Sequence, residues 1–490
     1  MKMGPLSKLH PLVWFILLAL VLRLVALGRE SLWYDEALSY HAAALPVSAL
    51  FDNTAESSHP PLYYALLHIW RGVVPRTDGA LRLLGALLNV ALVPALYALA
   101  RQWNRSHREA LAAAFMVVVS PFQILYSHEL RMYTLLMLLV TLTVWAYGRA
   151  RPQTGYGWWV LFCLLGAAAM YTHLFAAMTL LAIGLYALVH QQARAALWRT
   201  IGAGFGIILL YIPWLLVLFR GQTQAVGGLR PLLQSFTYNP ILPLTAPTFL
   251  LFGLSRTLIY SGLALFLTLA LLVVLLLEGR KAWRQGSGSG LLLPALIVFL
   301  TMGIPLAVYL VRPFFLPERT LAAAAPFLLL LLAWGLSRWG SPLPYLVGGA
   351  AALMVVGTLI YLLGPAQKPP YREVMAYVTA HSQPDDVILH TSDGSYLPAL
   401  YYTEWPDHGL LAGDPDPRKA AAVYEAFGGK VWPREAITAG ERLWLIVALE
   451  HSEEWQITQA DYFAQNYPLL ERQNIGGIEI YLYDLPFRMP

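Results

Sequence analysis

Long apolar runs dominate this sequence and limit what the chain can fold into. A bilayer crossing needs about 17–25 mostly apolar residues, and about eleven stretches of the chain reach that length. They lie near 11–28, 80–100, 109–126, 131–148, 156–173, 174–190, 200–219, 249–277, 290–311, 319–337 and 342–363. Only 12% of the residues are charged, whereas a soluble domain has about a quarter. The runs therefore predict an α-helical polytopic membrane protein with about eleven transmembrane helices.

The excess of basic residues has two interpretations. A formal net charge of +5 and a pI near 9.1 could indicate a nucleic-acid-binding protein. The arginines, however, lie in short loops between apolar runs, as membrane topology requires, so we expect no nucleic-acid partner. The single cysteine, Cys163, excludes a disulfide framework and a cysteine metal site. Residues 1–28 lack a convincing signal-peptide cleavage site and are expected to be retained as a first helix.

The segment 60–74 is apolar but short, and it begins with two prolines. It is either a further crossing or a helix in the membrane interface. If it does not cross, the loops rich in arginine after residues 100, 148, 193, 279 and 337 all lie in the cytoplasm, as the positive-inside rule predicts. We therefore expect an interfacial helix, an extracytoplasmic first loop at 29–79, and a C-terminal segment that also emerges outside the cytoplasmic (inner) membrane.

The composition changes near Ala366, where charged residues and alternating strand-like runs appear. Such runs are 386–390, 443–447 and 478–483, with helical patterns at 371–381 and 418–427. These patterns predict a small soluble α/β domain at 366–490 behind a membrane region at 1–365.

The first loop carries the most chemically suggestive pair of residues, Asp35 and Glu36, soon after the first helix. Adjacent carboxylates at a membrane surface could deprotonate a hydroxyl, bind a cation, or simply begin a solvated helix. His59 precedes two prolines, which is also the pattern of a rigid turn.

Several other polar residues fall at the predicted outer helix ends. They are Arg82, Glu129, Arg131, Tyr133, His173 and Arg319, with Arg23 in the outer half of the first helix. Charged side chains within hydrocarbon cost about 2.5–3.5 kcal/mol on insertion scales, so they usually face a cavity and serve function. Arg131 could instead pair with Glu129 or snorkel, and His173 could be a polar helix end. Because the cytoplasmic ends hold no comparable set, we expect the functional site outside.

The order of five short motifs resembles the GT-C fold membrane glycosyltransferases. The motifs are Trp33-x-Asp35-Glu36-Ala37, the His59-Pro-Pro-Leu-Tyr-Tyr64 segment, Leu81-Arg-Leu-Leu-Gly85, the Ser120-Pro to Glu129-x-Arg-Met-Tyr133 stretch and Tyr171-Thr-His173. The nearest likeness is to bacterial relatives of the protein O-mannosyltransferases, including lipid A aminoarabinose and galacturonic acid transferase-like proteins. The motifs span about residues 20–330.

The resemblance implies transfer of a sugar from a polyprenyl-phosphate donor to an extracytoplasmic hydroxyl of a lipid, glycan or protein acceptor. It makes Asp35 the candidate base, Glu36 its acidic neighbour, and Arg82 a supporting residue. His59, Glu129, Tyr133 and His173 are candidate substrate-binding residues. Arg131 and Arg319 would hold the donor phosphate, with Arg23 and Arg230 as further candidates. Some members of this group use a divalent cation, for which no ligands can be assigned here.

Two other function classes stay open at this stage. A polyprenyl-lipid transporter or flippase often shows symmetric halves with polar residues near the midplane, and we find no internal repeat. A non-enzymatic anchor that displays the C-terminal domain for binding would not need the first-loop residues.

Overall fold

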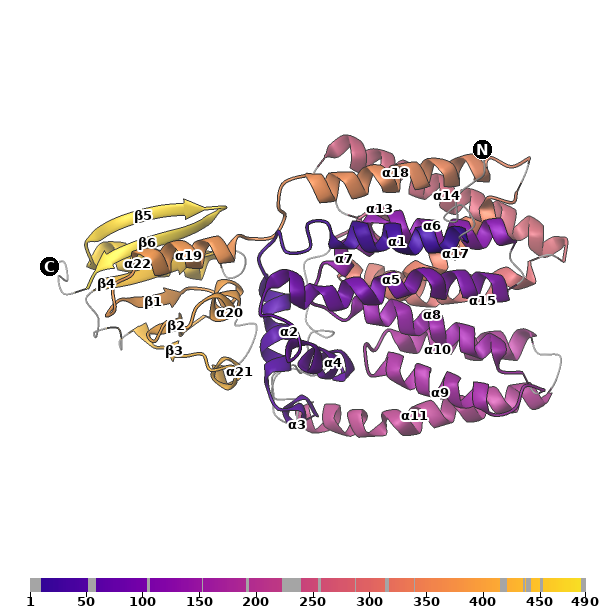
Figure 1. Ribbon diagram of the computed structural model, residues 1–490, viewed down its shortest axis with the longest axis horizontal. Helices are drawn as coiled ribbons and strands as arrows, with labels where there is room; N and C mark the ends of the chain where they lie inside the picture. The colour runs from indigo at the N-terminus through magenta and orange to yellow at the C-terminus, as the bar shows by residue number, and fades with distance from the viewer. Residues whose placement is uncertain are drawn as a thin grey trace, which may run out of the picture.

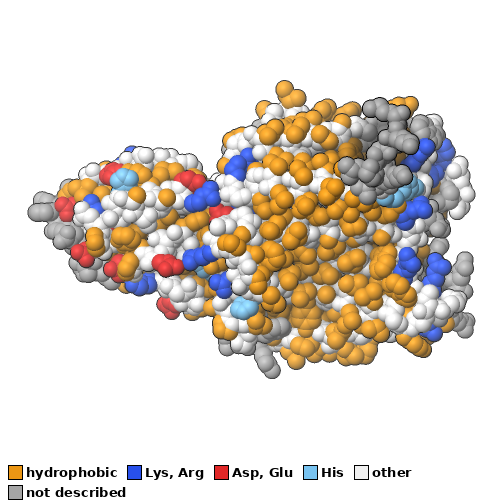
Figure 2. Space-filling view, in the orientation of Figure 1, with side chains coloured by type: hydrophobic (Ala, Val, Ile, Leu, Met, Phe, Trp, Pro, Cys, Tyr) orange, Lys and Arg blue, Asp and Glu red, His pale blue; other side chains and the backbone are white. Residues whose placement is uncertain are grey.

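The protein consists of a helical bundle and a smaller α/β part that packs against one end of it (Figure 1). The computed structural model describes residues 10–51, 59–103, 106–151, 153–190, 194–222, 239–253, 257–286, 288–312, 317–338, 340–414, 421–434, 437, 442–449 and 453–485. Hydrophobic side chains cover most of the visible face of the bundle, and basic side chains gather toward its two ends (Figure 2).

The bundle is built from elements at the positions of the predicted crossings. They are α1 (Pro11–Leu24), α5 (Asp78–Gln102), α6 (His107–Val119), α7 (Pro121–Ser127), α8 (Tyr133–Arg149), α9 (Gly157–Met170), α10 (Ala176–His190), α11 (Arg194–Gln222), α13 (Leu242–Phe252), α14 (Leu258–Arg284), α15 (Ser289–Val298), the π-helical η2 (Phe299–Gly303), α16 (Ile304–Val311), the 3₁₀-helical η3 (Glu318–Ala324), α17 (Ala325–Gly335) and α18 (Leu343–Leu363).

Among the described residues, six helices are long and apolar enough to cross a membrane, or seven if α6 and α7 count as one bent span. Five shorter apolar helices accompany them. The prediction of a multi-pass α-helical membrane protein is confirmed, and the number of crossings stays a prediction. The sequence predicted a single crossing at 249–277, but the structure divides this run between two helices. Gly253, with a φ of 68°, ends α13 after Phe252, and α14 begins at Leu258.

The predicted run 109–126 is broken where Pro121 interrupts the helix, and α6 and α7 meet there at 53°. Pro121 has no N–H to donate to the Val117 carbonyl four residues earlier. The fully buried guanidinium of Arg23 supplies the missing donors, with Nη2 2.7 Å from the Val117 oxygen and Nη1 2.9 Å from the Val118 oxygen. Arg23 Nε also donates to Asn89. The intramembrane arginine thus stabilises a helix break.

Replacing Arg23 by methionine should lower the free energy of unfolding by about 1–3 kcal/mol, because buried carbonyls lose their donors. Thermal unfolding of the purified protein in detergent measures this loss. Arg108→Met, at an exposed position near the start of α6, is the matched control and should leave the unfolding midpoint unchanged. Equal midpoints for the two variants would contradict this role of Arg23.

The first loop forms three short helices, α2 (Tyr34–Ala44), α3 (Val47–Phe51) and α4 (Leu62–Arg71), at the end of the bundle that faces the α/β part (Figure 1). With 10 residues, α4 is about 15 Å long, which is half the thickness of a bilayer core. The segment 60–74 is therefore too short to cross as one straight helix, and its place in the membrane interface stays a prediction.

The C-terminal part contains α19 (Tyr371–His381), β1 (Val387–His390), α20 (Asp393–Tyr402), β2 (His408–Leu411), α21 (Ala421–Ala426), β3 (Val431–Trp432), β4 (Arg442–Val447), α22 (Glu453–Asn466), β5 (Leu469–Ile475) and β6 (Ile478–Asp484). Its sheet has the order β3-β2-β1-β4-β6-β5, parallel from β3 to β4 and antiparallel from β4 to β5. The α/β prediction is confirmed, and we propose its boundary at 365/366.

The two parts share a buried apolar cluster. Tyr34, Ala37 and Leu38 of α2 pack with Tyr396 and Leu397 of α20. His41 adds a hydrogen bond from its ring to the Leu397 carbonyl at 3.0 Å. The helix that carries Asp35 and Glu36 is therefore held between the bundle and the α/β part.

Candidate functional site

A buried ion pair between Glu36 and Arg82 organises the first loop. Both Arg82 Nη2 and Nε reach the Glu36 carboxylate, at 2.7 and 2.8 Å, and both side chains are almost completely buried. Burial raises the pKa of the Glu36 carboxyl, but the charges of Arg82 and Lys368 outweigh burial and lower it to about 2. Glu36 is therefore ionised at neutral pH.

Arg82 also fixes the backbone that leads into α2. Its guanidinium donates to the carbonyls of Leu27, Glu30 and Ser31 at 3.3, 2.6 and 2.9 Å. With every nitrogen of the guanidinium donating, Arg82 is suited to shaping the loop rather than to contacting a substrate.

Asp35 points to a different neighbour from Glu36, because successive residues of a helix do not face the same way. Its carboxylate lies 3.1 Å from Arg319 Nη2 at the start of η3. The side chains are 15% and 27% exposed, whereas Glu36 is fully buried. Arg319 also lies over the Trp33 ring, 5.7 Å from its centroid. Among these groups, Asp35 and Arg319 form the ion pair with the more exposed side chains.

Arg131 joins Asp35 to the loop between α7 and α8. Its Nη1 lies 3.1 Å from Ser39 Oγ and 3.3 Å from the Asp35 carbonyl oxygen. The sequence-based alternative of an Arg131–Glu129 ion pair is not seen among the described contacts. Arg131 instead stabilises the first turns of α2.

Glu129, Tyr133 and the two histidines complete the cluster. The Tyr133 ring lies 6.1 Å from that of His173, which stacks on His59 at 5.5 Å. Burial, with a smaller effect from Arg131, lowers the pKa of His173 to about 4, so its ring is neutral at pH 7. Burial also raises the pKa of the Glu129 carboxyl, although the Lys368 ammonium opposes this shift.

The structure thus brings together all nine residues that the sequence singled out for the site: Asp35, Glu36, His59, Arg82, Glu129, Arg131, Tyr133, His173 and Arg319. Two further phosphate-ligand candidates are not part of this group. Arg23 is committed to the α6–α7 break, and Arg230 lies outside the described residues.

Lys368 is a site residue that the sequence reasoning missed. It follows α18 and places its ammonium 2.9 Å from Glu36 Oε2 and 4.0 Å from Glu129 Oε1. A lysine in a polar stretch after a long apolar run carries no sequence signal for such a contact.

The described residues contain no group of three or more His, Cys, Asp or Glu side chains arranged to hold a metal ion. The divalent cation that the family resemblance suggests therefore stays an expectation, and we assign no ligands to it.

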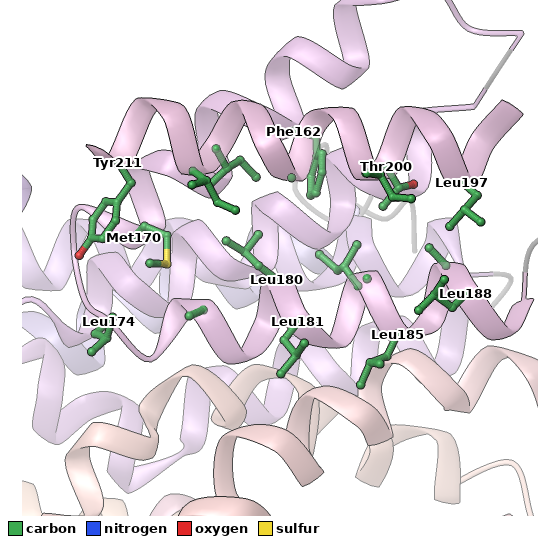
Figure 3. A pocket seen from close by; sticks show the side chains of 18 of the residues that line it. Phe162, Met170, Leu174, Leu180, Leu181, Leu185, Leu188, Leu197, Thr200 and Tyr211 are labelled. Carbon is green, nitrogen blue, oxygen red and sulfur yellow. The ribbon is translucent and has the colours of Figure 1, made fainter. Parts of the chain in front are cut away.

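An apolar groove of about 600 Å³ runs along α9, α10 and α11 (Figure 3). Leu174 lies at one end, next to His173 in sequence, and Leu188 and Leu197 lie at the other. The thirteen residues of α10 from Ala176 to Leu188 correspond to about 20 Å of helix. The groove can therefore accept a long hydrocarbon chain that ends near the polar cluster.

Comparison with known proteins shows what this chain resembles. A family model described as dolichyl-phosphate-mannose-protein mannosyltransferase matches residues 58–217, which include Arg82, Glu129 and His173 but not Asp35 or Arg319. No curated protein matches significantly by sequence.

Two crystal structures of ArnT from Cupriavidus metallidurans share the fold over nearly the whole chain. The structure with bound undecaprenyl phosphate is 13% identical, with a TM-score of 0.63, and the apo structure is 12% identical, with a TM-score of 0.64. Each match covers 96% of this chain and 97% of that chain.

Proposed function

The chain has the GT-C fold of membrane glycosyltransferases, and we propose that it transfers a sugar from a polyprenyl-phosphate-linked donor to an acceptor hydroxyl. The observation that carries this proposal is the partly exposed Asp35–Arg319 pair, 3.1 Å apart. An apolar groove that begins at Leu174, next to His173 of the same cluster, supports it. This reaction needs a carboxylate that accepts the proton of the hydroxyl and a cation that binds the phosphate. It also needs an apolar groove that holds the lipid tail. The bound undecaprenyl phosphate of the ArnT structure is consistent with such a donor.

The reaction follows from these groups in one displacement. The Asp35 carboxylate takes the proton of the acceptor hydroxyl as its oxygen attacks the anomeric carbon. The bond from that carbon to the phosphate oxygen breaks, and polyprenyl phosphate leaves with the bonding electrons. A single displacement inverts the anomeric configuration. Because a phosphate is a good leaving group, a strong general acid is not required.

Arg319 has two roles in this proposal. Without substrate it neutralises Asp35. A donor phosphate would compete for the guanidinium, which forms charge-assisted hydrogen bonds with phosphate. Donor binding would thereby release Asp35 for the acceptor hydroxyl. Glu36 and Arg82 are assigned to positioning, since both side chains are almost completely buried and paired with each other.

Replacing Arg319 by glutamine should raise the KM for the lipid-linked donor by about tenfold or more, because one charge-assisted contact is worth about 1.5–3 kcal/mol. Initial rates at varied donor concentration measure this change. Arg312→Gln is the matched control, because Arg312 is exposed and lies seven residues earlier. An unchanged KM in the Arg319 variant would remove it as a phosphate ligand.

We place the site on the extracytoplasmic side of the cytoplasmic (inner) membrane, on the basis of the arginine-rich loops at the opposite helix ends. The acceptor is then a lipid, glycan or protein of the cell envelope. Mass spectrometry of cell-surface glycans with and without the protein tests this placement. Loss of one sugar substituent without the protein is expected, and identical glycan profiles would contradict the proposal.

A further inference from the structure

The segment between the bundle and the α/β part, residues 364–370, is bound to the first loop on both sides of Lys368. We call this segment the connector. The Arg29 guanidinium donates to the carbonyls of Leu362 at 2.8 Å and Gly364 at 3.1 Å, where α18 ends. The Gln367 N–H donates to Glu30 Oε1 at 2.6 Å. The connector therefore follows the first loop closely.

The start of α19 is fixed to the same loop. Arg372 Nη1 lies 3.0 Å from Asp78 Oδ2 and 3.2 Å from the Gly28 carbonyl oxygen. Ser31 Oγ donates to Glu373 Oε2 at 3.0 Å. Lys368 lies between these anchors, so its backbone has little freedom to move away from the site.

The Lys368 side chain is 9% exposed, and its ammonium lies near two buried carboxylates. Glu36 Oε2 accepts from it at 2.9 Å, Glu129 Oε1 lies 4.0 Å away, and the His128 carbonyl oxygen lies at 3.4 Å. Glu36 has Arg82 as a second cation, whereas among the described ion pairs Glu129 has only Lys368. The other Glu129 oxygen, Oε2, is buried with no hydrogen-bond partner among the described residues.

Two buried carboxylates this close together repel each other unless a cation lies between them. Without Lys368, Glu36 would keep Arg82 as its partner, but Glu129 would lose the one cation with which it forms an ion pair among the described residues. Glu129 would then have to move, or to take up a proton, next to Asp35 and Arg319, which both act on its charge. The connector therefore supplies the cation that neutralises buried negative charge next to Asp35 and Arg319.

We propose that Lys368 is a positioning residue of the transfer site, through which the C-terminal α/β part completes the site instead of only being attached to it. This inference rests on the proposed glycosyl transfer. Lys368 holds Glu36 and Glu129 in place by charge, and it touches neither donor nor acceptor. Its removal should therefore affect turnover more than donor binding.

The first test compares Lys368→Met with Lys368→Arg in the full-length protein in proteoliposomes. The methionine variant should lose at least about tenfold in kcat, because small displacements of reacting groups cost that much or more. Its KM for a polyprenyl-phosphate sugar should change by less than about threefold. The arginine variant keeps the charge and should recover most of the turnover. Lys430→Met is the matched control, because Lys430 belongs to the α/β part but is about half exposed and pairs with Asp407.

Three results would overturn the inference: wild-type kcat in Lys368→Met, a loss confined to KM, or an arginine variant as slow as the methionine variant. An inactive wild-type protein would instead contradict the proposed function itself.

A second test needs no activity. Thermal unfolding is measured for Lys368→Met, Glu129→Gln and the double variant. Glu129→Gln removes the charge that Lys368 neutralises, so the double variant should unfold at a higher temperature than Lys368→Met. Strictly additive shifts in the unfolding midpoints would show that the two side chains do not act on each other, whatever the wild-type activity.

Discussion

Replacing Asp35 by asparagine should reduce kcat for sugar transfer by about 10²–10⁴-fold, the range that a positioned general base contributes. Asparagine has nearly the same shape as aspartate but cannot accept the proton of the acceptor hydroxyl. The helix α2 should keep its fold, because its buried contacts come from Tyr34, Glu36 and Leu38 rather than from the Asp35 carboxylate. Rates with a polyprenyl-phosphate sugar and thermal unfolding, measured on the same preparation, separate the two effects.

The matched control for this variant is Asp407→Asn. Asp407 is about half exposed and lies in the α/β part, where it pairs with Lys430. Its replacement should alter neither turnover nor unfolding. If Asp35→Asn transferred sugar at the wild-type rate, Asp35 would be removed from the mechanism, and Glu129 would become the next carboxylate to replace.

Replacing Arg82 by methionine should destabilise the protein by about 3–5 kcal/mol, the loss expected when one partner of a buried ion pair is removed. The change leaves the Glu36 carboxylate without its bidentate partner and frees the carbonyls of Glu30 and Ser31. Lysine should rescue little of the loss, because a single ammonium cannot reproduce the planar set of donors. Thermal or denaturant unfolding in detergent measures the effect.

The control for Arg82 is Arg76→Met. Arg76 pairs with Glu404 at 2.9 Å, but the two side chains are 46% and 85% exposed. Exposed pairs contribute about 0–1 kcal/mol. The hydrogen bond from Arg76 Nη2 to the Tyr401 carbonyl, at 2.7 Å, adds about 0.5–1.5 kcal/mol, so this variant should lose clearly less stability than the Arg82 variant. Equal destabilisation of the two variants would mean that the Glu36–Arg82 pair does not organise the first loop.

Much of the fold could be predicted because lipid imposes simple rules on sequence. Apolar runs gave the positions of the helices, and the length of 60–74 together with the arginine-rich loops indicated a helix that does not cross. The helix break at Pro121 was harder to predict, since its stability depends on Arg23, almost a hundred residues away. An arginine in an apolar run indicates a buried partner but does not identify it.

The site could be predicted as a set of residues but not as a set of contacts. Asp35 and Glu36 look equivalent as neighbours in sequence, and only their helix shows that one faces Arg319 and the other Arg82. Lys368 could not be found at all, because its partner Glu36 is 332 residues away and its local surroundings resemble an ordinary linker. Contacts across such separations depend on how the α/β part docks.

The most direct test of the account is a reconstituted transfer reaction. Proteoliposomes containing the purified protein receive a polyprenyl-phosphate donor with a labelled sugar, together with envelope acceptor material. We expect labelled acceptor and released polyprenyl phosphate in equal amounts, with inverted anomeric configuration, and neither product with Asp35→Asn. Movement of the intact donor across the bilayer without any sugar transfer would contradict the account and indicate a lipid transporter.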